Sequence, residues 1–202
     1  MRNTIYTFAL AAICLMASNI NAQDAAAKLN QADASYSSKD LENTRYSLQQ
    51  ALIEINKAVG KDILDLLPKS INGLDVITKD DNVSGSAGFA GLFVNRSYGS
   101  TEDKNIKVEI ISDSPMLAGL NAMLAMPMIM GNSDPNQKRM KISGYKAVLQ
   151  KSTSDETIVS YTLQIPLNQA LFTLHVKGIP GENDVINIAN ALPLDQIAKL
   201  AQ

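Results

Sequence analysis

The sequence predicts an α+β protein, in which an N-terminal α-helical hairpin precedes an antiparallel β-sheet with packed helices. Apolar residues recur with a helical period from Asp24 to Leu67, and the pattern changes to alternation after Pro68. The strand candidates that follow are joined by short polar turns and not by long crossover helices, which is typical of antiparallel hairpins. The chain is therefore divided into residues 1–22, 23–67 and 68–202.

Residues 1–22 are expected to be a secretory signal peptide that is cleaved. Arg2 precedes an uncharged apolar stretch over 5–16, and the segment ends in Ile20-Asn21-Ala22, which fits signal peptidase. The apolar stretch is far shorter than the roughly 20 residues that span a bilayer. We therefore expect an exported mature chain that begins near Gln23, lies in the periplasm or is secreted, and has no transmembrane span.

Composition narrows the classes of partner. The single cysteine, Cys14, lies inside the predicted signal peptide, so the mature chain would hold no thiol, disulfide or thiolate metal site. Loss of Arg2 leaves 17 Lys and Arg residues against 20 Asp and Glu residues, a net charge of about −3. Because nucleic acids require a concentrated basic face, no nucleic-acid partner is expected.

The hairpin of residues 23–67 is predicted from two apolar stripes, with the helices meeting at Ser37-Ser38, Ser38 as the N-cap of the second helix and Pro68 as its end. The second stripe comprises Leu41, Leu48, Leu52, Ile55, Val59, Ile63 and Leu66. Residues 29–52, with small residues at Ala32, Thr44 and Ala51, resemble a single tetratricopeptide-type hairpin. That resemblance implies stacking on further helices. Because the motif occurs once and repeat arrays need about three copies, packing of the hairpin on the chain's own domain is the favoured interpretation.

The domain of residues 68–202 is predicted to be a sheet with helices. Ser114 and Pro115 introduce a helix over 116–126, and two helices over 182–191 and 194–201 close the chain. A slip in the alternation at Ile142-Ser143-Gly144-Tyr145 predicts a bulge or tight turn. The predicted strands are 74–79, 91–98, 106–112, 140–142, 145–151, 158–165 and 171–177.

The order of these elements, the stretch Ile142-Ser143-Gly144-Tyr145-Lys146-Ala147 and the final strand that ends in Lys177-Gly178 are similar to the PsbP-like and Mog1-like α+β proteins. The resemblance covers about 74–201. It implies an accessory or binding protein without catalysis, and it transfers no functional residue.

No catalytic constellation, metal site or cofactor site is predicted. His175 is the only histidine, and Gly85-Ser86-Ala87-Gly88 lies before a strand and lacks the nucleophile-elbow pattern. The paired acids Asp80-Asp81 and Asp155-Glu156 lack the spacing of a calcium loop. Five methionines between Met116 and Met130 suggest Cu(I) as one alternative, although methionine more often fills irregular cores.

Two uncharged, apolar stretches over 82–95 and 114–133 are the most informative candidates for function. The leading hypothesis is a non-catalytic exported protein that binds a protein partner through its hairpin or the Met-rich segment. The alternative is a carrier of an apolar small molecule or lipid, in a pocket lined by 114–130 and 84–93; a hydrolase stands third. The residues expected at such a surface are Phe89, Leu92, Phe93, Met116, Leu120, Met123, Leu124 and Met128.

Overall fold

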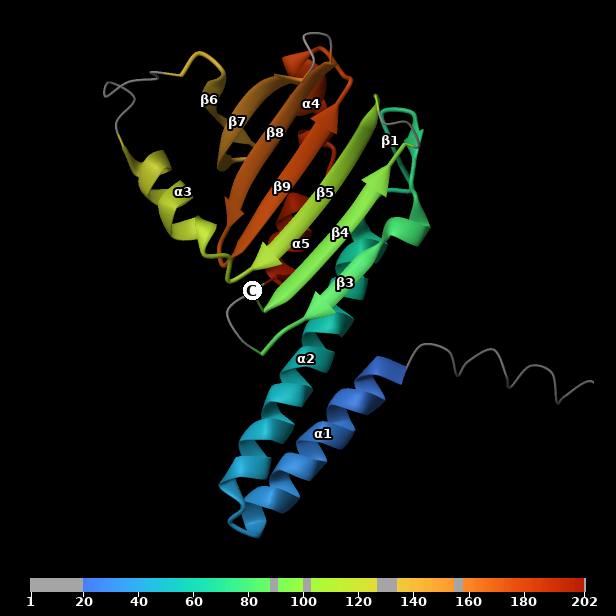
Figure 1. The fold of residues 1–202 in the computed structure, drawn as a ribbon, viewed down its shortest axis with the longest axis vertical. Coiled ribbons are helices and arrows are strands. Elements are labelled where there is room, and N and C mark those ends of the chain that lie inside the picture. The colour runs from blue at the N-terminus through green and yellow to red at the C-terminus, as the bar shows by residue number, and fades with distance from the viewer. Residues whose placement is uncertain (1–19, 88–90, 100–102, 127–133, 155–157, 202) are drawn as a thin grey trace, which may run out of the picture. The chain divides into compact units, whose positions relative to one another are not determined.

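The computed structural model describes residues 20–87, 91–99, 103–126, 134–154 and 158–201. These residues form the predicted α+β protein with a helical hairpin, a seven-stranded antiparallel sheet and a second, two-stranded sheet (Figure 1). Contacts divide the chain between Ile55 and Asn56 into an N-terminal and a C-terminal unit. The predicted signal peptide lies outside the described residues, except for residues 20–22 at the start of the first helix.

The helices and strands follow the predicted order. The helices are α1 (Ile20–Ser37), α2 (Leu41–Leu66), α3 (Met116–Ala125), α4 (Glu182–Asn190) and α5 (Leu194–Leu200), with a 3-10 turn, η1 (Thr78–Asp80). The strands are β1 (Ser70–Ile71), β2 (Leu74–Asp75), β3 (Asn82–Gly85), β4 (Leu92–Tyr98), β5 (Asn105–Ser112), β6 (Gln137–Ile142), β7 (Tyr145–Ser154), β8 (Ile158–Leu167) and β9 (Ala170–Lys177).

The helix α2 begins at a cap different from the predicted one. Asp40, and not Ser38, caps α2, because its carboxylate accepts a hydrogen bond from the backbone N–H of Asn43 at 3.1 Å. Hydrogen bonds from the backbone and side chain of Asn43 lower the pKa of Asp40. The Ser38 hydroxyl donates instead to the carbonyl oxygen of Ser35 at 2.9 Å. The intervening Lys39 has a φ of +63°, which turns the chain so that Asp40 reaches the cap position.

One face of the large sheet forms the main core of the C-terminal unit. The strands lie in the order β3-β4-β5-β9-β8-β7-β6, and all neighbours are antiparallel. Val94, Leu163 and Phe172 point to this face and are fully buried. The helices α4 and α5 cover it, with Val185 and Ile197 in the same apolar cluster (Figure 1). The last turns of α2 contribute Ile63 to the same cluster.

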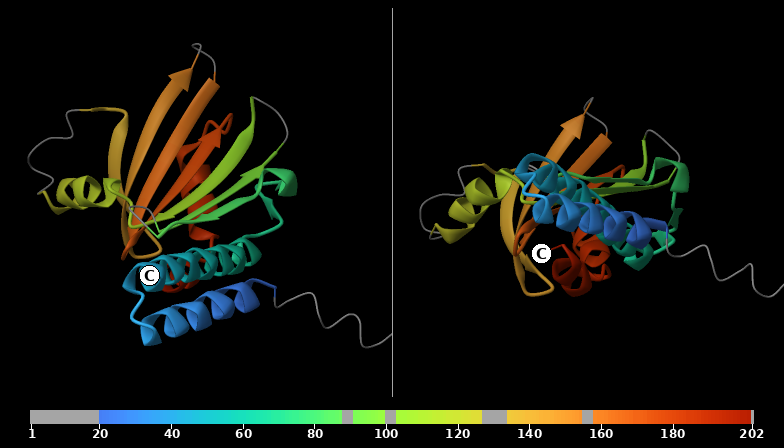
Figure 2. Two further views of the ribbon diagram at one scale, coloured as in Figure 1. Left: turned by 60° about the horizontal axis from the view of Figure 1, so that its bottom comes forward. Right: turned by 90° about the horizontal axis from the view of Figure 1, so that it is seen from below.

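The opposite face carries a small apolar cluster at one end. Because side chains alternate along a strand, Val148 and Leu171 point away from the main core. They form the small cluster with Leu120 of α3. Figure 2 shows α3 at the side of the sheet where β6 and β7 lie. The remainder of this face includes the predicted polar positions Ser160, Thr162, Gln164, Thr173, His175 and Lys177, of which all but Thr173 are half-buried.

Two strand predictions need correction. The strand predicted over 74–79 shrinks to β2, because Asn72 and Gly73 adopt positive φ and fold β2 back on the short β1 before η1 begins. The sequence predicts no strand between 79 and 91, but residues 82–85 form the edge strand β3, which pairs with β4. Glycine lowers strand propensity and obscured this strand in the sequence.

The tight turn predicted around Gly144 is confirmed. Ser143 and Gly144 have φ values of +48° and +88° and connect β6 to β7 as a two-residue hairpin loop. Positive φ at both central residues matches the right-handed twist of the strands. The turn pairs Ile142 with Tyr145 and thereby fixes which side chains of β6 and β7 share a face.

The end of α2 is held by a buried ion pair. Arg96 of β4 forms a bidentate pair with Asp81, with nitrogen–oxygen distances of 2.9 and 2.6 Å. Its remaining Nη1 donates to the carbonyl oxygens of Leu64 and Leu67 at 2.6 and 3.3 Å. These carbonyls belong to the last turn of α2, where a cation also complements the helix dipole. The hydrogen bond with Asp81 raises the pKa of Arg96 and keeps it charged.

Candidate binding surfaces

The helix α3 presents one apolar side to the sheet. Leu120 is buried against Val148 and Leu171, with Leu117, Met123 and Leu124 packed around it. Met116 and Met126, at the two ends of α3, are each 56% exposed. Of the predicted surface residues, Leu120 is therefore part of the small core, Met123 and Leu124 are half-buried, and Met116 is open to solvent. Met128 lies outside the described residues.

The predicted residues of β4 do not share a surface. Leu92 is 2% exposed and belongs to the main core, while its neighbour Phe93 points to the opposite face. The register places Phe93 beside Ile111, and Ile111 beside Leu171, so Phe93 lies on the face that carries α3. A pocket that contains both Leu92 and Phe93 conflicts with this alternation. Phe89 lies outside the described residues.

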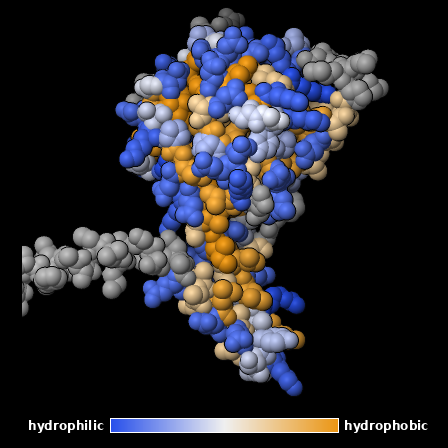
Figure 3. All heavy atoms as spheres, turned by 180° about the vertical axis from the view of Figure 1, so that it is seen from behind, coloured by the Kyte–Doolittle hydropathy of each residue, from blue (hydrophilic) through white to orange (hydrophobic). Residues whose placement is uncertain are grey.

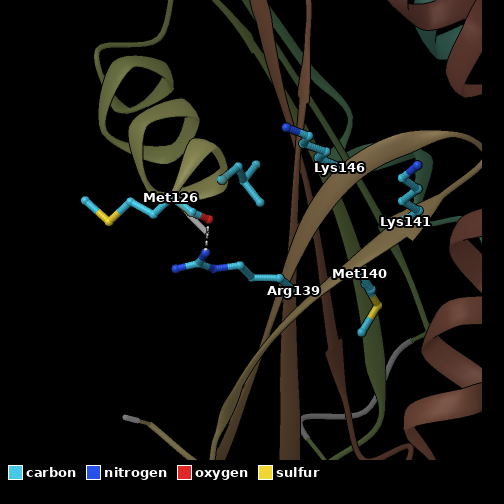
Figure 4. A pocket seen from close by; sticks show the side chains of 6 residues that line it. Met126, Arg139, Met140, Lys141 and Lys146 are labelled. Atoms are coloured by element: carbon cyan, nitrogen blue, oxygen red, sulfur yellow. Dashed lines mark hydrogen bonds between the residues drawn. The ribbon is translucent and has the colours of Figure 1, made fainter. Parts of the chain in front are cut away.

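A cavity opens where the end of α3 meets the edge of the sheet (Figure 4). Its volume is about 280 Å³, and its lining residues are Leu124, Met126, Arg139, Met140, Lys141 and Lys146. The Nη1 of Arg139 reaches across and donates to the carbonyl oxygen of Met126 at 2.9 Å. Leu124 belongs to the predicted surface, whereas the basic residues were not singled out in the sequence.

The three basic residues of this cavity gather on one face. Lys141 and Lys146 are directly paired across β6 and β7, and Arg139 pairs with Val148 of the α3 face. Within the described part of the chain, no acidic side chain forms an ion pair with any of the three. Like charges directly opposite across strands are destabilising. The cavity therefore combines an apolar lining with unneutralised positive charge.

His175 lies on the open polar face of the sheet. Its Nε2 is 3.4 Å from Glu109 Oε2, and its Nδ1 is 3.3 Å from the Thr162 hydroxyl. Burial opposes ionisation of Glu109, but the hydrogen bond and charge of Lys107, helped by His175, lower its pKa. The His175 side chain is 40% exposed, and it lines none of the cavities described for this chain. Among the described residues, these distances place Thr162 and Glu109, and no serine, beside the ring nitrogens of His175.

Metal-ligating side chains are dispersed in the described part of the chain. No group of three His, Cys, Asp or Glu residues there is close enough to hold a metal ion. Asp81 is engaged by Arg96, and Asp155-Glu156 and Met130 lie outside the described residues. Met116 and Met126 stand at opposite ends of α3 and do not converge.

The N-terminal unit buries small residues between its helices and exposes large ones. Ala25 and Ala32 of α1 and Ser47 and Ala51 of α2 are 9%, 4%, 0% and 1% exposed. Large apolar side chains at neighbouring helical positions are 40 to 65% exposed: Leu29, Tyr36, Leu41, Leu48, Leu52 and Ile55. We call these six residues the apolar stripe. Figure 3 shows apolar residues gathered on the hairpin.

Helix geometry places the whole stripe on one side of the hairpin. Lys28 is half-buried and lies one helical turn from both Ala25 and Ala32, on the face of α1 that meets α2. Leu29 follows Lys28 in sequence, just as Leu48 and Leu52 follow the buried Ser47 and Ala51. Each of these leucines is therefore rotated by about 100° about its helix axis from the interhelical contact. The two helices run in opposite directions. The same step of about 100° along each helix therefore places the exposed apolar residues of α1 and those of α2 on the same side of the hairpin. Two columns with a seven-residue spacing result, Leu29 with Tyr36 and Leu41 with Leu48 and Ile55.

No known protein family, curated protein or solved structure matches this chain. None of the described helices is long and apolar enough to cross a membrane.

Proposed function

We propose that this chain is an exported, non-catalytic accessory protein that binds a partner protein through the apolar stripe of its hairpin. The observation that carries the proposal is the inverted packing of the hairpin, with small residues inside and six large apolar residues outside. A monomer rarely exposes a contiguous apolar surface of this kind unless it serves an interaction.

The geometry of the stripe favours an amphipathic helix as the occupant. Two columns at seven-residue spacing border a floor of small residues, which matches the groove that receives a third helix in coiled-coil packing. Asp33 and Arg45 occupy equivalent helical positions, one on each column, and both are exposed. Their opposite charges would fix the direction in which a charged partner helix lies.

The test is site-specific photo-crosslinking in the organism that makes the protein. A photoreactive residue replaces Leu52 in the stripe and, as control, Tyr46, which is exposed to a similar degree, 54% against 50%, but lies on the other side of α2. We expect one crosslinked partner from position 52 and none from position 46. Leu48→Asp should abolish the crosslink while urea unfolding of the purified chain stays unchanged.

Three outcomes would contradict the proposal. A crosslinked species of twice the chain's own mass would show that a second copy occupies the stripe. Equal crosslinking from positions 46 and 52 would show non-specific contact. Loss of stability in Leu48→Asp would assign the stripe to the folding of the chain itself.

A further inference from the structure

We infer that the cavity between α3 and the β6–β7 hairpin binds a single-chain amphiphile with an anionic head, of the fatty carboxylate class. This site is distinct from the apolar stripe and does not depend on the proposed partner. The inference rests on the size of the cavity, its lining and its charge.

The lining provides both halves of such a ligand. Leu124 and Met126 at the end of α3 supply apolar side chains, and methionine in particular adjusts to flexible alkyl chains. Met140 borders the cavity from β6, but its side chain packs against the main core on the other face. Arg139, Lys141 and Lys146 supply the charge on the same face of the sheet. Figure 4 shows Arg139 extending from β6 toward the end of α3, where its guanidinium meets the carbonyl oxygen of Met126.

The charge favours an anion over a neutral apolar molecule. Lys141 and Lys146 face each other across the two strands and repel, and a carboxylate between them would neutralise this repulsion. The Nη1 of Arg139 donates to the Met126 carbonyl oxygen. The other N–H groups of the Arg139 guanidinium remain for a ligand.

The volume limits the length of the ligand. A cavity of about 280 Å³ lies just below the range of about 300 to 1,000 Å³ that small-molecule sites usually occupy. It therefore fits one alkyl chain of medium length and is too small for the two chains of a phospholipid. A second cavity of comparable volume, about 310 Å³, is lined by Ile71, Ile188 and Leu192 among others, and none of its described lining residues is charged.

The test uses decanoate as probe, with the full chain in low salt and below the concentration at which the probe forms micelles. Titration calorimetry should show one saturable site, and each methylene added from hexanoate to decanoate should tighten binding about fourfold. Decyltrimethylammonium, which has the same chain and the opposite charge, should bind at least tenfold more weakly. Raised salt should weaken decanoate binding.

The double variant Lys141→Gln, Lys146→Gln should weaken decanoate binding about tenfold or more. Lys177→Gln on the same face at the far end of β9 is the matched control and should bind as the unmodified chain does. Urea unfolding should show all three chains equally stable or the double variant slightly more stable, because its substitution removes repulsion between exposed side chains.

Methionine-methyl NMR would locate the probe. Decanoate should shift the signal of Met126 and leave that of Met116, at the other end of α3, in place. Leu48→Asp in the apolar stripe should leave the affinity unchanged, which separates this site from the proposed partner surface. Equal binding of decanoate and decyltrimethylammonium, no effect of the double variant, or the absence of a saturable site would overturn the inference.

Discussion

The hairpin and the sheet domain place their apolar residues in opposite ways. In the sheet domain, large side chains such as Phe172 and Leu163 are fully buried, and the large apolar residues exposed in its described part are Met116 and Met126 at the ends of α3. In the hairpin, alanine and serine fill the interhelical contact, and Leu48 and Leu52 are 46% and 50% exposed. The large side chains in its core stabilise the sheet domain. The small residues between the two helices bury little apolar area, so a partner that buries the apolar stripe would stabilise the hairpin most.

Replacing a leucine by alanine should give the largest difference in unfolding free energy between the sheet domain and the hairpin. Leu163→Ala removes a side chain with 0% exposure and should lower the free energy of unfolding by about 2 to 5 kcal/mol. Leu52→Ala should change it by about 0.5 kcal/mol or less, because half of that side chain is already in solvent. Urea denaturation followed by circular dichroism measures both. Equal losses would show that the stripe contributes to the fold of the isolated chain.

The second prediction concerns the point where α2 joins the core of the sheet domain. Arg96→Met should destabilise the chain by about 3 kcal/mol, because it leaves the Asp81 carboxylate without its cation and removes the hydrogen bonds to the carbonyl oxygens of Leu64 and Leu67. Asp81→Asn should cost less, since the amide still accepts one hydrogen bond. The double variant should be less destabilised than the sum of the two, and additive losses would show that the pair is not coupled.

Much of the fold was readable from the sequence, because period and turn chemistry are local signals. The change from helical to alternating pattern at Pro68 and the slip at Gly144 located the hairpin, the sheet and the β6–β7 turn correctly. The edge strand β3 was missed because its glycine-containing sequence lacks strand propensity, and the cap at Asp40 because Ser38 and Asp40 both suit a cap. In each case the choice depends on backbone conformation at a neighbouring residue, such as Lys39.

The candidate binding surfaces are harder to predict from the sequence, because they depend on the face of the helix or sheet to which each side chain points. Leu92 and Phe93 looked like one apolar patch in sequence, but a strand sends adjacent side chains to opposite faces. The basic residues of the cavity could have been found from the turn, since a two-residue loop at Ser143-Gly144 pairs Lys141 with Lys146. The inverted packing of the hairpin had no such signal, because both sides of each helix contain apolar residues.

A pH titration tests the core of the sheet domain without touching the hairpin. Burial raises the pKa of Tyr98 to about 12, although the Arg96 charge opposes the shift; an exposed tyrosine titrates near 10. Because the folded-state pKa is the higher, the stability from the protonated phenol is complete below pH 10 and is lost as the pH rises toward 12. The loss should reach about 2 kcal/mol, measured as the shift of the urea midpoint.

Tyr98→Phe is the control for this titration. It removes the phenol hydroxyl, which donates to the Pro68 carbonyl oxygen at 2.9 Å, and should cost about 1 kcal/mol below pH 10. Above pH 10 the variant should lose less stability than the unmodified chain. A variant that follows the same pH curve as the unmodified chain would assign the loss to other groups.

Two helical glycines give the smallest and most local contrast between packed and open positions. A Cβ at Gly60 of α2 would lie 2.4 Å from Val83 Cγ1 and 2.9 Å from Leu92 Cδ1, so Gly60→Ala should destabilise the chain by about 1 to 2 kcal/mol. A Cβ at Gly119 of α3 meets no atom within 4 Å, so Gly119→Ala should stabilise by about 0.5 to 1 kcal/mol through helix propensity alone. Thermal unfolding of the two variants compares them directly. Stabilisation by both substitutions would show that Val83 of β3 and Leu92 of β4 move to accept the added methyl group. Close packing at Gly60 would then not be required for α2 to pack on the sheet.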